Sequence, residues 1–350
     1  MRVLNYLELE DHLGPSGIRT AVRQQRSALQ DAGVTVVDTL TQGGPTSATQ
    51  SALSGQSPTV DYDLAHVNTV GPGSVAVATH ALRTGRPLVV HAHVTREDFR
   101  DSFRGSNALS VPLGRYLRWF YSRADLVLCP SEYTRSLLEQ YPVTTEIRPM
   151  TNGVDIADLA GHATLREPTR ETYDLSGTVV FTVGHVYERK GLSTFCELAQ
   201  ATDYTYAWFG PYRTDPLASS TVKRHVRSPP ENVTFTGWVE DRRSAFAAGD
   251  IYFFPSKAEN QGIAVLEAMA TGNPVVARDI PVFREYFTDG EDIVLCESGE
   301  EFRAAIDRLA DDPALRERLA KNARETAVEH SLDRVGDLLV STYRDLLDRV

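Results

Sequence analysis

The sequence contains few of the residues that build disulfide frameworks or metal sites. Its 350 residues include only three cysteines, Cys129, Cys196 and Cys296, which are odd in number and lie far apart. Neither a CxxC pair nor a Cys/His cluster occurs, so neither a disulfide scaffold nor a zinc site is indicated. No Asp-rich metal motif stands out, and we expect the protein to use no metal and no cofactor. The cysteine pattern fits a reducing cytoplasm.

Long apolar runs are missing as well. No stretch approaches the 18 apolar residues of a membrane-spanning helix. The N-terminal sequence MRVLNYLELEDHLG has acidic residues where a signal peptide needs its apolar stretch. Basic residues are in deficit, with a formal net charge of −11. Because nucleic-acid binding needs a basic face, we expect no nucleic-acid partner, and we expect a cytoplasmic location.

What the sequence does contain is a regular alternation of short apolar runs and longer helical patterns. The expected strands are RVLNYLEL, VTVVDTL, DLAHVNTV, PLVVHAHV, ADLVLCPS and TEIRPM in the first half, and TVVFTVG, TYAWFG, VTFTGWV, DIYFFPS, PVVARD and DIVLCES in the second. Strands separated by helices form right-handed βαβ units and parallel sheets. Two such sets predict an α/β protein with two Rossmann-like domains.

Three other segments complete this prediction. We place the break between the domains within Asn152–Thr178, which carries Gly, Pro and Thr and lacks clear periodicity. We interpret Ser219–Asn232, SSTVKRHVRSPPEN, as a polar, basic loop. The segment Pro313–Val350 is expected to be almost wholly helical.

The stretch AENQGIAVLEAMATGNPVVARDIP, residues 258–281, follows one of the expected strands. We expect a loop and then a helix that begins near Gly262 or Ile263. Ligands of doubly wound sheets lie beyond the carboxyl ends of the strands, and free amides at a helix N-terminus bind phosphate. Glu259 in the loop and Glu267 one turn inside the helix could accept hydrogen bonds from hydroxyl groups on either side of that phosphate, as in a nucleotide sugar. Spacing alone leaves open that the first is a helix-dipole partner and the second a solvated helix residue.

Two further loops follow strands in the same way. In VGHVYERKG the strand ends at Gly184, and Arg189 and Lys190 precede a new helix, an arrangement that suits a diphosphate. In LGPSGIRT, Gly14 and Gly17 allow the backbone to approach a ligand. Each loop also has a simpler interpretation, a solvated charge pair in the first and an ordinary βα turn in the second.

With these three segments in order, the chain resembles the retaining glycosyltransferases of family 4, and in particular the branch that contains the glucosyl-diacylglycerol synthases. PSKAENQGIAVLEAMATGNPVVARDIPVF is similar to the family's Glu-seven-residues-Glu segment, VGHVYERKG to its Arg/Lys loop and GPSGI to its glycine loop. HAHVTREDFRDSF, PSEYT and NGVD resemble the same branch. The similarity runs from LGPSGI to DIVL, which is nearly the whole chain.

The resemblance implies the GT-B architecture, in which two Rossmann-like βαβ domains face an interdomain cleft. We expect an N-terminal acceptor-binding domain at residues 1–155, a C-terminal nucleotide-sugar domain at 170–330, and a C-terminal helix at 331–350 that packs back on the N-terminal domain. The implied reaction moves a hexose, by default glucose, to an acceptor hydroxyl of a membrane lipid such as diacylglycerol, with the anomeric configuration retained. UDP-hexose is preferred over GDP-hexose as the donor. On the front-face route of the family, the leaving phosphate oxygen helps to take the acceptor proton, so no separate base is needed.

The resemblance also assigns roles to individual residues. Catalytic roles fall to His93, Glu259, Lys190 and Arg189. Donor-binding roles fall to Gly17, Gly184, Arg189, Lys190, Glu259, Asn260, Gln261, Gly262, Ile263 and Glu267. Within these sets Glu259 would bond sugar hydroxyls and Glu267 the ribose. His93 would face the reacting sugar, with His91 as the alternative.

The segment 100–123, RDSFRGSNALSVPLGRYLRWFYSR, carries five arginines against one acid, a local charge of +4 in a protein of −11. Aromatic and aliphatic residues are interleaved with the arginines, a composition that suits the surface of an anionic membrane. The expected acceptor or membrane residues are Arg100, Phe103, Arg104, Arg115, Arg118 and Trp119. On this interpretation the protein is peripheral on the inner face of the cell membrane. Alternatively, the apolar residues belong to the core, and the arginines line the acceptor cleft or solvate a helix.

Three other functions stay open at this point. The same fold could use a soluble or polymeric glycan as the acceptor. The segment VGPGSVAVA follows a strand and, through Gly71, Gly73 and Ala76, spells the G-x-G-x-x-A pattern of a NAD-dependent oxidoreductase. The next strand, however, ends in histidines where an acid for the ribose is wanted. A catalytically silent sugar-nucleotide-binding protein is the third alternative, and the intact pairs of glutamates and cations argue against it.

Overall fold

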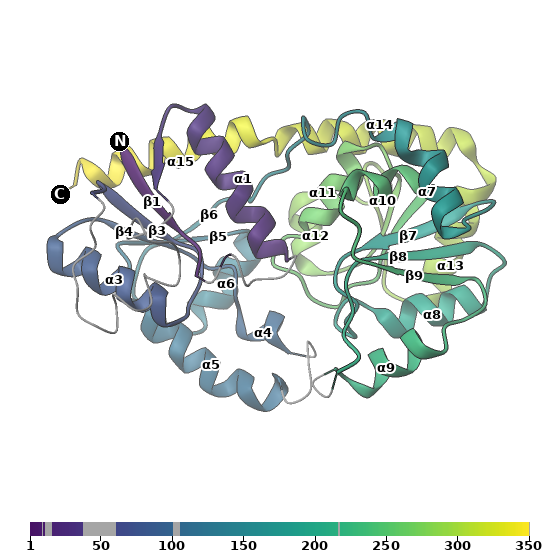
Figure 1. The fold of residues 1–350 in the computed structure, drawn as a ribbon, viewed down its shortest axis with the longest axis horizontal. Coiled ribbons are helices and arrows are strands. Elements are labelled where there is room, and N and C mark those ends of the chain that lie inside the picture. Colours follow the sequence, from purple (N-terminus) through teal and green to yellow (C-terminus); the bar gives the residue numbers. More distant parts are fainter. Residues whose placement is uncertain (9, 11–15, 38–60, 101–105, 216–217, 350) are drawn as a thin grey trace. The chain divides into compact units, whose positions relative to one another are not determined.

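The computed structural model describes residues 1–350 except 9, 11–15, 38–60, 101–105, 216–217 and 350 (Figure 1). Contacts within the chain divide it into two compact units. Unit 1 consists of Met1–Glu97, Leu109–Gly153 and Ser331–Val350, and unit 2 consists of Asp98–Ala108 and Val154–His330. Each unit is built around a parallel sheet, so the predicted α/β class with two Rossmann-like domains is confirmed.

Unit 1 contains a sheet in which, within the described residues, six parallel strands lie in the order β2-β1-β3-β4-β5-β6. Their bounds are β1 Arg2–Tyr6, β2 Thr35–Val37, β3 Leu64–Val67, β4 Leu88–His91, β5 Leu126–Cys129 and β6 Ile147–Pro149. The helices in this part of the fold are α1 Gly17–Asp31, α3 Pro72–Thr84, α4 Arg96–Phe99, α5 Ser106–Tyr121, α6 Glu132–Glu139 and α15 Leu332–Leu347. All six strands are those that the sequence predicts.

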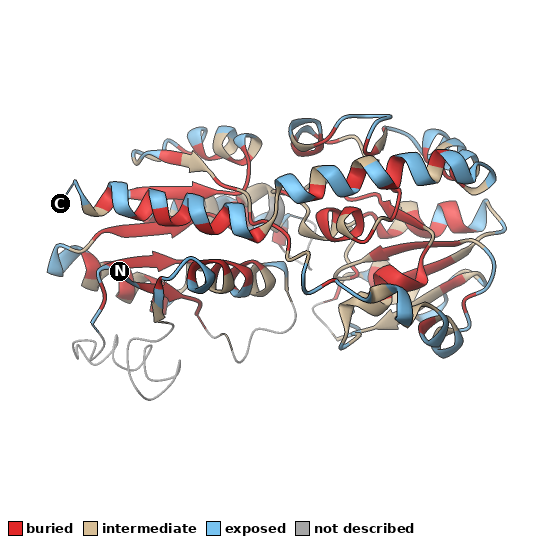
Figure 2. Ribbon diagram, turned by 90° about the horizontal axis from the view of Figure 1, so that it is seen from above, coloured by how far each residue is buried: buried red, intermediate tan, exposed pale blue. Residues whose placement is uncertain are grey.

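The central strands of unit 1 are buried on both faces, which explains their nearly continuous apolar sequences. Leu4 and Val90 belong to one core cluster, whereas Val3 and Val89 belong to the cluster on the opposite side. In Figure 2 the central strands are buried, and the helices bury one face and expose the other. Helix α15 adds apolar residues to the second of these clusters, namely Val335, Leu339, Val340, Tyr343 and Leu346.

Unit 2 repeats this plan, with strand order β12-β11-β10-β7-β8-β9 among the described residues. The strands are β7 Val179–Val183, β8 Thr205–Phe209, β9 Val233–Gly237, β10 Ile251–Phe254, β11 Val275–Arg278 and β12 Val294–Cys296. The helices are η1 His162–Leu165, α7 Arg166–Tyr173, α8 Leu192–Gln200, α9 Ser220–Arg227, α10 Arg242–Ala248, α11 Ile263–Ala270, α12 Pro281–Tyr286, α13 Gly299–Asp311 and α14 Pro313–Glu329. In its core the ring of Phe195 packs on those of Trp208 and Phe253. Helices α14 and α15 fill most of Pro313–Val350, as the sequence predicts.

The structure contains two polar helices that the sequence pattern does not predict. The interpretation of Ser219–Asn232 as a loop is wrong, because α9 occupies Ser220–Arg227 and Ser219 caps it by accepting a hydrogen bond from the Val222 amide. Only Val222 of this helix is buried. The segment Asn152–Thr178 contains η1 and α7, and only Thr169 of α7 is buried. A helix that buries a single residue produces no apolar periodicity, so the sequence does not reveal it.

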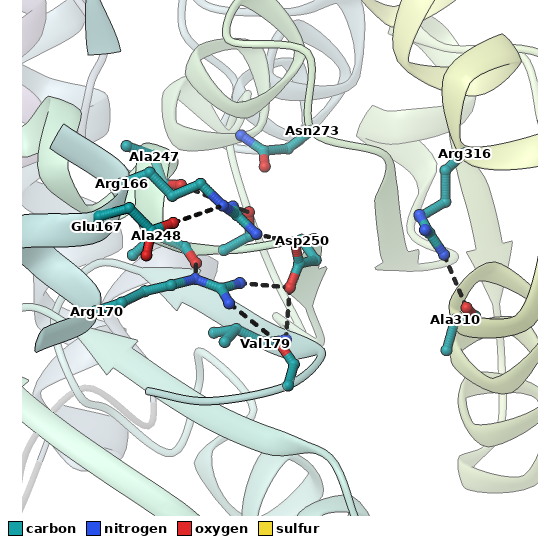
Figure 3. Close-up of polar contacts among 12 residues, drawn as sticks. Arg166, Glu167, Arg170, Val179, Ala247, Ala248, Asp250, Asn273, Ala310 and Arg316 are labelled. Carbon is teal, nitrogen blue, oxygen red and sulfur yellow. Dashed lines mark hydrogen bonds and ion pairs between the residues drawn. The ribbon is translucent and has the colours of Figure 1, made fainter. Parts of the chain in front are cut away.

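Ion pairs fasten α7 to the neighbouring elements of unit 2, as Figure 3 shows, and the ring of Tyr173 also packs edge-on against Phe209. The guanidinium of Arg166 lies 2.5 Å from Oδ1 of Asp250, and that of Arg170 lies 2.6 Å from Oδ2. Asp250 Oδ2 also accepts a hydrogen bond from the Val179 amide at the start of β7. The carboxylate of Asp250 therefore fastens α7 to the amino end of the sheet in unit 2.

Candidate active site

The segment after β10 enters α11 through a left-handed glycine. Gly262 has a φ of +93° and is the N-cap of α11, so the helix begins where the sequence predicts it. A Cβ at Gly262 would lie 2.9 Å from Cε1 of Phe283, so both the backbone and the space favour glycine. The first amides of an α-helix lack partners within the helix, and the helix dipole adds positive charge there. This helix N-terminus lies at the carboxyl end of β10 and can bind a phosphate group.

A second glycine brings the loop between β7 and α8 against the loop after β10. Gly191 has a φ of +84°, and a Cβ there would lie 2.4 Å from the carbonyl oxygen of Pro255. The amide of Lys257 donates a hydrogen bond of 2.8 Å to the carbonyl oxygen of Arg189. Because β7 and β10 are neighbours in the sheet, the two loops meet at the same edge. This contact brings together the Arg/Lys and Glu segments that the sequence singles out.

Glu259 lies at the centre of this contact and is 8% exposed. Its Oε1 is 2.5 Å from the Lys190 ammonium and 3.6 Å from the Arg189 guanidinium. The same oxygen accepts a hydrogen bond of 2.5 Å from Ser256 Oγ. Burial by itself would raise the pKa of Glu259, but Lys190 and Arg189 outweigh it, so the pKa lies below its ordinary value. The carboxylate is therefore charged at neutral pH. Ser256 was not predicted as a site residue, although it lies two residues after the end of β10.

Glu267, one turn inside α11, has a different environment. It is 5% exposed, and burial raises its pKa to about 7. The guanidinium Nε of Arg242 lies 3.0 Å from Glu267 Oε1 and opposes the shift, whereas the Asp158 and Asp155 carboxylates add to it. Those two atoms are close but not aligned for a hydrogen bond. Arg242 also pairs with Asp158 at 2.9 Å. Arg242 was not predicted, because its nearness to Glu267 depends on the fold.

The remaining predicted donor residues lie in several places. Gly184 directly follows β7, has a φ of +141° and accepts a hydrogen bond from the Trp208 indole through its carbonyl. Gln261 is buried and Asn260 is half-buried in the loop before α11. Gly17 is the first residue of α1 in unit 1, and a Cβ there would meet nothing within 4 Å. Gly14, from the same predicted loop, lies outside the described residues.

His91 and His93 stand at the carboxyl end of β4 in unit 1. Their rings are stacked, with centroids 4.1 Å apart and planes 4° from parallel. The ring of His66 is also stacked with that of His91, with centroids 5.6 Å apart. Burial lowers the pKa of His93 to about 3 and keeps the pKa of His91 well below its ordinary value. The three imidazoles are therefore neutral at physiological pH, and His93 is the more exposed of the β4 pair, at 7% against 1%.

Helix α5 divides the basic aromatic segment between core and surface. Leu117 and Phe120 belong to the unit 1 core, as the alternative interpretation expects. Trp119 is 41% exposed, and Arg115 and Arg118 are exposed too. Leu109 and Val111 are also exposed hydrophobic residues of this helix, and Arg100 is exposed in the turn after α4. Phe103 and Arg104 lie outside the described residues.

The dinucleotide fingerprint is explained by a buried carboxylate. Oε1 of Glu8 accepts a hydrogen bond from the Gly73 amide, and Oε2 accepts from the amide and hydroxyl of Ser74. A Cβ at Gly71 would lie 2.4 Å from Oε2 of Glu8. The glycines therefore make room for Glu8, which occupies the start of α3 where a dinucleotide phosphate would have to bind. Nothing in this arrangement supports an oxidoreductase.

Two features of the described residues lie apart from these groups. A hollow of about 480 Å³ in unit 2 is lined by Arg166, Asn273 and Arg316 among others. It lies at the amino ends of β10 and β11, whereas the glutamates lie at the carboxyl ends. Within the described part of the chain, no group of three His, Cys, Asp or Glu side chains is placed to hold a metal ion.

Comparison with known proteins decides the family. Residues 45–158 match the family described as Glycosyltransferase Family 4, and residues 167–326 match the one described as Glycosyl transferases group 1. The processive diacylglycerol alpha-glucosyltransferase of Acholeplasma laidlawii is 28% identical to the chain, over 99% of both sequences. The chain is a family 4 glycosyltransferase.

Further similarities of this glycosyltransferase agree with that assignment. The alpha-monoglucosyldiacylglycerol synthase of Streptococcus pneumoniae is 25% identical over 58% of this chain and 48% of its own. The crystal structure of Anabaena HepE in complex with UDP and glucose superposes with a TM-score of 0.77 at 19% identity, over 99% of this chain and 100% of that one. Sucrose-phosphate synthase from Thermosynechococcus elongatus gives 0.78 at 19% identity over 100% of both. The structural likeness shows the shared GT-B fold, and the family places the enzyme among the hexosyltransferases, as predicted.

Proposed function

We propose that this glycosyltransferase transfers a hexose, with glucose preferred, from a UDP-sugar to a hydroxyl group of a glycerolipid of the diacylglycerol type, with the anomeric configuration retained. The observation that carries the proposal is the meeting of Glu259, Lys190 and Arg189 beside the N-terminus of α11. Such a site offers acceptors for sugar hydroxyls and donors for a diphosphate. The names of the relatives, diacylglycerol glucosyltransferase and glucosyldiacylglycerol synthase, support the lipid acceptor. The complexes of HepE with UDP and with UDP-glucose support the donor.

In the proposed donor binding, the diphosphate replaces Glu259 as a partner of the basic side chains. In the structure the Lys190 ammonium is paired with Glu259. An incoming diphosphate would share Lys190 and Arg189, and each charge-assisted hydrogen bond would contribute roughly 1.5–3 kcal/mol. The carboxylate of Glu259 would then accept hydrogen bonds from the sugar hydroxyls. The amides of Gly262 and Ile263 would bind the phosphate and sugar, and the remaining loop residues Gly184, Asn260 and Gln261 would complete the donor site.

The chemical step follows from the same groups. Breaking the bond between the sugar and the phosphate leaves a nucleoside diphosphate, whose growing negative charge must be stabilised. Lys190, Arg189 and the N-terminus of α11 supply that stabilisation where other enzymes use a divalent ion. The leaving phosphate oxygen takes the proton of the acceptor hydroxyl on the face from which it departs. In unit 1, His93 would face the reacting sugar and Gly17 the phosphate.

A donor screen followed by product analysis tests this proposal. The purified enzyme is incubated with UDP-glucose, UDP-galactose and GDP-mannose, first alone and then with diacylglycerol in mixed micelles. We expect release of UDP from UDP-glucose and a glycolipid whose anomeric proton shows the α-configuration of the donor. A β-linked product would contradict retention. Transfer to soluble glycans but not to diacylglycerol would replace the acceptor in the proposal.

We also propose that the exposed face of α5 binds an anionic membrane surface. Val111, Arg115, Arg118 and Trp119 lie on one face of this helix by their spacing, and all four are exposed. Arginines beside an exposed aromatic residue suit an interface with anionic lipid, and each basic residue near the surface contributes about 1 kcal/mol. No helix among the described residues is both long and apolar enough to cross a bilayer. Such a surface would bring a lipid acceptor to the enzyme at the inner face of the cell membrane.

Vesicle sedimentation tests the membrane proposal. We expect binding to vesicles that contain phosphatidylglycerol, weakening as salt is raised, and little binding to phosphatidylcholine alone. The double variant Arg115→Glu, Arg118→Glu should lose most of this binding. Arg318→Glu, an exposed arginine of α14, is the matched control and should keep it. Binding that ignores lipid charge and salt would contradict the proposal.

A further inference from the structure

A circuit of hydrogen-bonded, buried polar side chains links His91 to His93 in unit 1. It is formed by Asn5 on β1, Gln25 on α1 and Asn68 just after β3, together with the two histidines. Each of these side chains is at most 7% exposed. Buried amides and imidazoles must match donors with acceptors, because an unmatched polar group costs about 1–3 kcal/mol in such a place. The direction of every hydrogen bond in the circuit therefore depends on the others.

Arg26 fixes that direction at one point. Its guanidinium pairs with Glu10 at 2.7 Å and donates a hydrogen bond of 2.9 Å to the carbonyl oxygen of Asn5. Its Nε lies 3.3 Å from the side chain of Asn5. A guanidinium has only donors, so the Asn5 atom that it meets must be the acceptor Oδ1. The NH₂ group of Asn5 then points the other way.

One branch of the circuit runs from Asn5 to His91. The Asn5 Nδ2 donates to Gln25 Oε1 at 3.3 Å, so the other end of the Gln25 amide is its NH₂ group. That group lies 3.0 Å from Nδ1 of His91. Because the amide nitrogen can only donate, Nδ1 of His91 accepts and carries no proton. The proton of the neutral His91 ring is therefore on Nε2, for which the described residues provide no hydrogen-bond partner, so the tautomer is set at Nδ1.

The other branch runs from Asn5 to His93. Oδ1 of Asn5 also meets the Asn68 side chain at 3.2 Å, and an acceptor there requires the NH₂ group of Asn68. The carbonyl end of the Asn68 amide then lies 3.2 Å from Nε2 of His93. An amide oxygen can only accept, so Nε2 of His93 carries the proton. Nδ1 of His93 keeps its lone pair, and any further hydrogen bond at that atom is one that the ring accepts.

We propose that Arg26, acting through Asn5, Gln25 and Asn68, is a positioning residue that holds His91 and His93 in the Nε2-protonated tautomer. The neutral His93 ring then presents an electron pair, and not a proton, at Nδ1. An electron pair suits a sugar that gains positive character in the transition state, whereas a proton there would oppose it. This catalytic consequence depends on the proposed role of His93 in hexose transfer. The tautomer itself follows from the circuit alone.

Nitrogen NMR on protein labelled with ¹⁵N-histidine tests the tautomer directly, because protonated and bare ring nitrogens resonate far apart. His91→Gln and His93→Gln variants identify the two signals. We expect both residues to show a proton on Nε2 and a bare Nδ1 at neutral pH. A proton on Nδ1 of either ring would overturn the proposal. The NMR measurement needs no substrate, so its outcome does not depend on whether the enzyme transfers a hexose.

The Arg26→Met variant tests whether Arg26 sets the direction of the hydrogen bonds in the circuit. Without the donor that fixes Asn5, the one remaining constraint on the amide directions is the long contact of 3.5 Å between Asn68 Nδ2 and the carbonyl oxygen of Tyr6, among the described residues. The His91 and His93 signals should therefore become a mixture of both tautomers. With UDP-glucose as donor, kcat should fall at least about tenfold while the KM of the donor changes little. Arg26→Lys is the matched control, because an ammonium is also a donor only, and it should restore a single tautomer and most of kcat.

Unchanged signals in a folded Arg26→Met protein would overturn the role of Arg26. If that variant does not fold, Arg26→Gln takes its place, since an amide can present either polarity to Asn5 and should again give mixed tautomers. If the unsubstituted enzyme gives the expected NMR spectrum but transfers no hexose, the proposed function is rejected and the tautomer assignment stays intact.

Discussion

At the scale of the residue, a substitution of Lys190 tests whether this side chain contributes to catalysis. It is partly exposed, and its main partner is the buried Glu259. When Lys190 is lost, Glu259 keeps the Arg189 guanidinium and the Ser256 hydroxyl as partners. We predict that Lys190→Ala lowers kcat at least roughly tenfold, about 1.4 kcal/mol of transition-state stabilisation, in a protein that still folds but melts at a lower temperature because Glu259 loses its closest partner. Steady-state kinetics with UDP-glucose measures this.

The matched control is Lys257→Ala. This lysine lies in the loop after β10, is exposed, and pairs with Glu188 at 2.8 Å rather than with either glutamate of the site. We expect its kcat to stay within about twofold of that of the unsubstituted enzyme. Equal losses in both variants would indicate a general electrostatic effect, and unchanged turnover in Lys190→Ala would remove that residue from catalysis.

Glu267 leads to a prediction about pH. Its pKa is raised to about 7, so it is protonated below that pH and charged above it. Only the carboxylate can accept a hydrogen bond from each of two ribose hydroxyls with both oxygens. Donor affinity should therefore rise as pH rises, by about tenfold between pH 6 and pH 8, and then level off. Calorimetric titration with UDP-glucose, whose diphosphate does not titrate in this range, measures the change.

Glu267→Gln supplies the control for that titration. A neutral amide has no proton to lose near pH 7, so the variant should bind the donor weakly and with the same affinity at both pH values. A pH dependence that survives in Glu267→Gln would assign the titration to another group. Affinity that falls with rising pH in the unsubstituted enzyme would contradict the proposed role.

At the scale of the element, helix α7 depends on one carboxylate. Asp250 accepts from Arg166, Arg170 and the Val179 amide, and its removal leaves all three donors without this partner (Figure 3). We predict that Asp250→Ala lowers the free energy of unfolding by about 2 kcal/mol, after allowance for partial exposure of the pairs. Chemical denaturation followed by circular dichroism measures the change.

Glu167→Ala is the control on the same helix. Its side chain is 79% exposed and its carboxylate lies 4.0 Å from the Arg166 guanidinium. An ion pair that is this long and this exposed to solvent does not stabilise the helix appreciably. We expect a change below about 0.5 kcal/mol. If Asp250→Ala were equally mild, the α7 helix would have to be held by packing that its single buried residue does not suggest.

The elements also show what a sequence can and cannot predict. All twelve expected strands are present, because strands buried on both faces have apolar runs that stand out from their neighbours. The start of α11 was predictable as well, since Gly262 follows a strand and precedes an apolar helix. Helices α7 and α9 were not, because each buries only one residue completely and is otherwise polar.

In the candidate site, too, some features could be predicted from the sequence and others could not. Glu259, Lys190 and Arg189 could be singled out because each lies within a few residues of a strand end. Their pairing, and that of Arg242 with Glu267, joins segments distant in the sequence, so no local pattern announces it. Glu8 illustrates the converse, since a local glycine pattern suggests a phosphate site that a distant carboxylate already fills.

At the scale of the whole molecule, helix α15 is the last described element in the sequence, yet it belongs to unit 1. Gly336 lies where it crosses α1, and a Cβ there would be 2.7 Å from the carbonyl oxygen of Ala28. We predict that Gly336→Val lowers the melting temperature of unit 1, because the added methyl groups must force the two helices apart at a cost of about 1–3 kcal/mol. Differential scanning calorimetry measures this.

Gly299→Ala is the control for that substitution. Gly299 begins α13, and a Cβ there meets nothing within 4 Å. We expect no loss of stability, since alanine is the better helix former. A Gly336→Val protein as stable as the unsubstituted enzyme would show that the contact between α1 and α15 can relax.

The assignment of α15 to unit 1 has a consequence for synthesis on the ribosome. Residues 154–330, which form nearly all of unit 2, are complete before α15 is translated. The sheet of unit 1 is made before unit 2 but lacks the cover of Val335, Leu339 and Tyr343 until α15 emerges from the exit tunnel. The half of the protein that is translated first is therefore the half that matures last, and chaperones would meet its uncovered face during that interval.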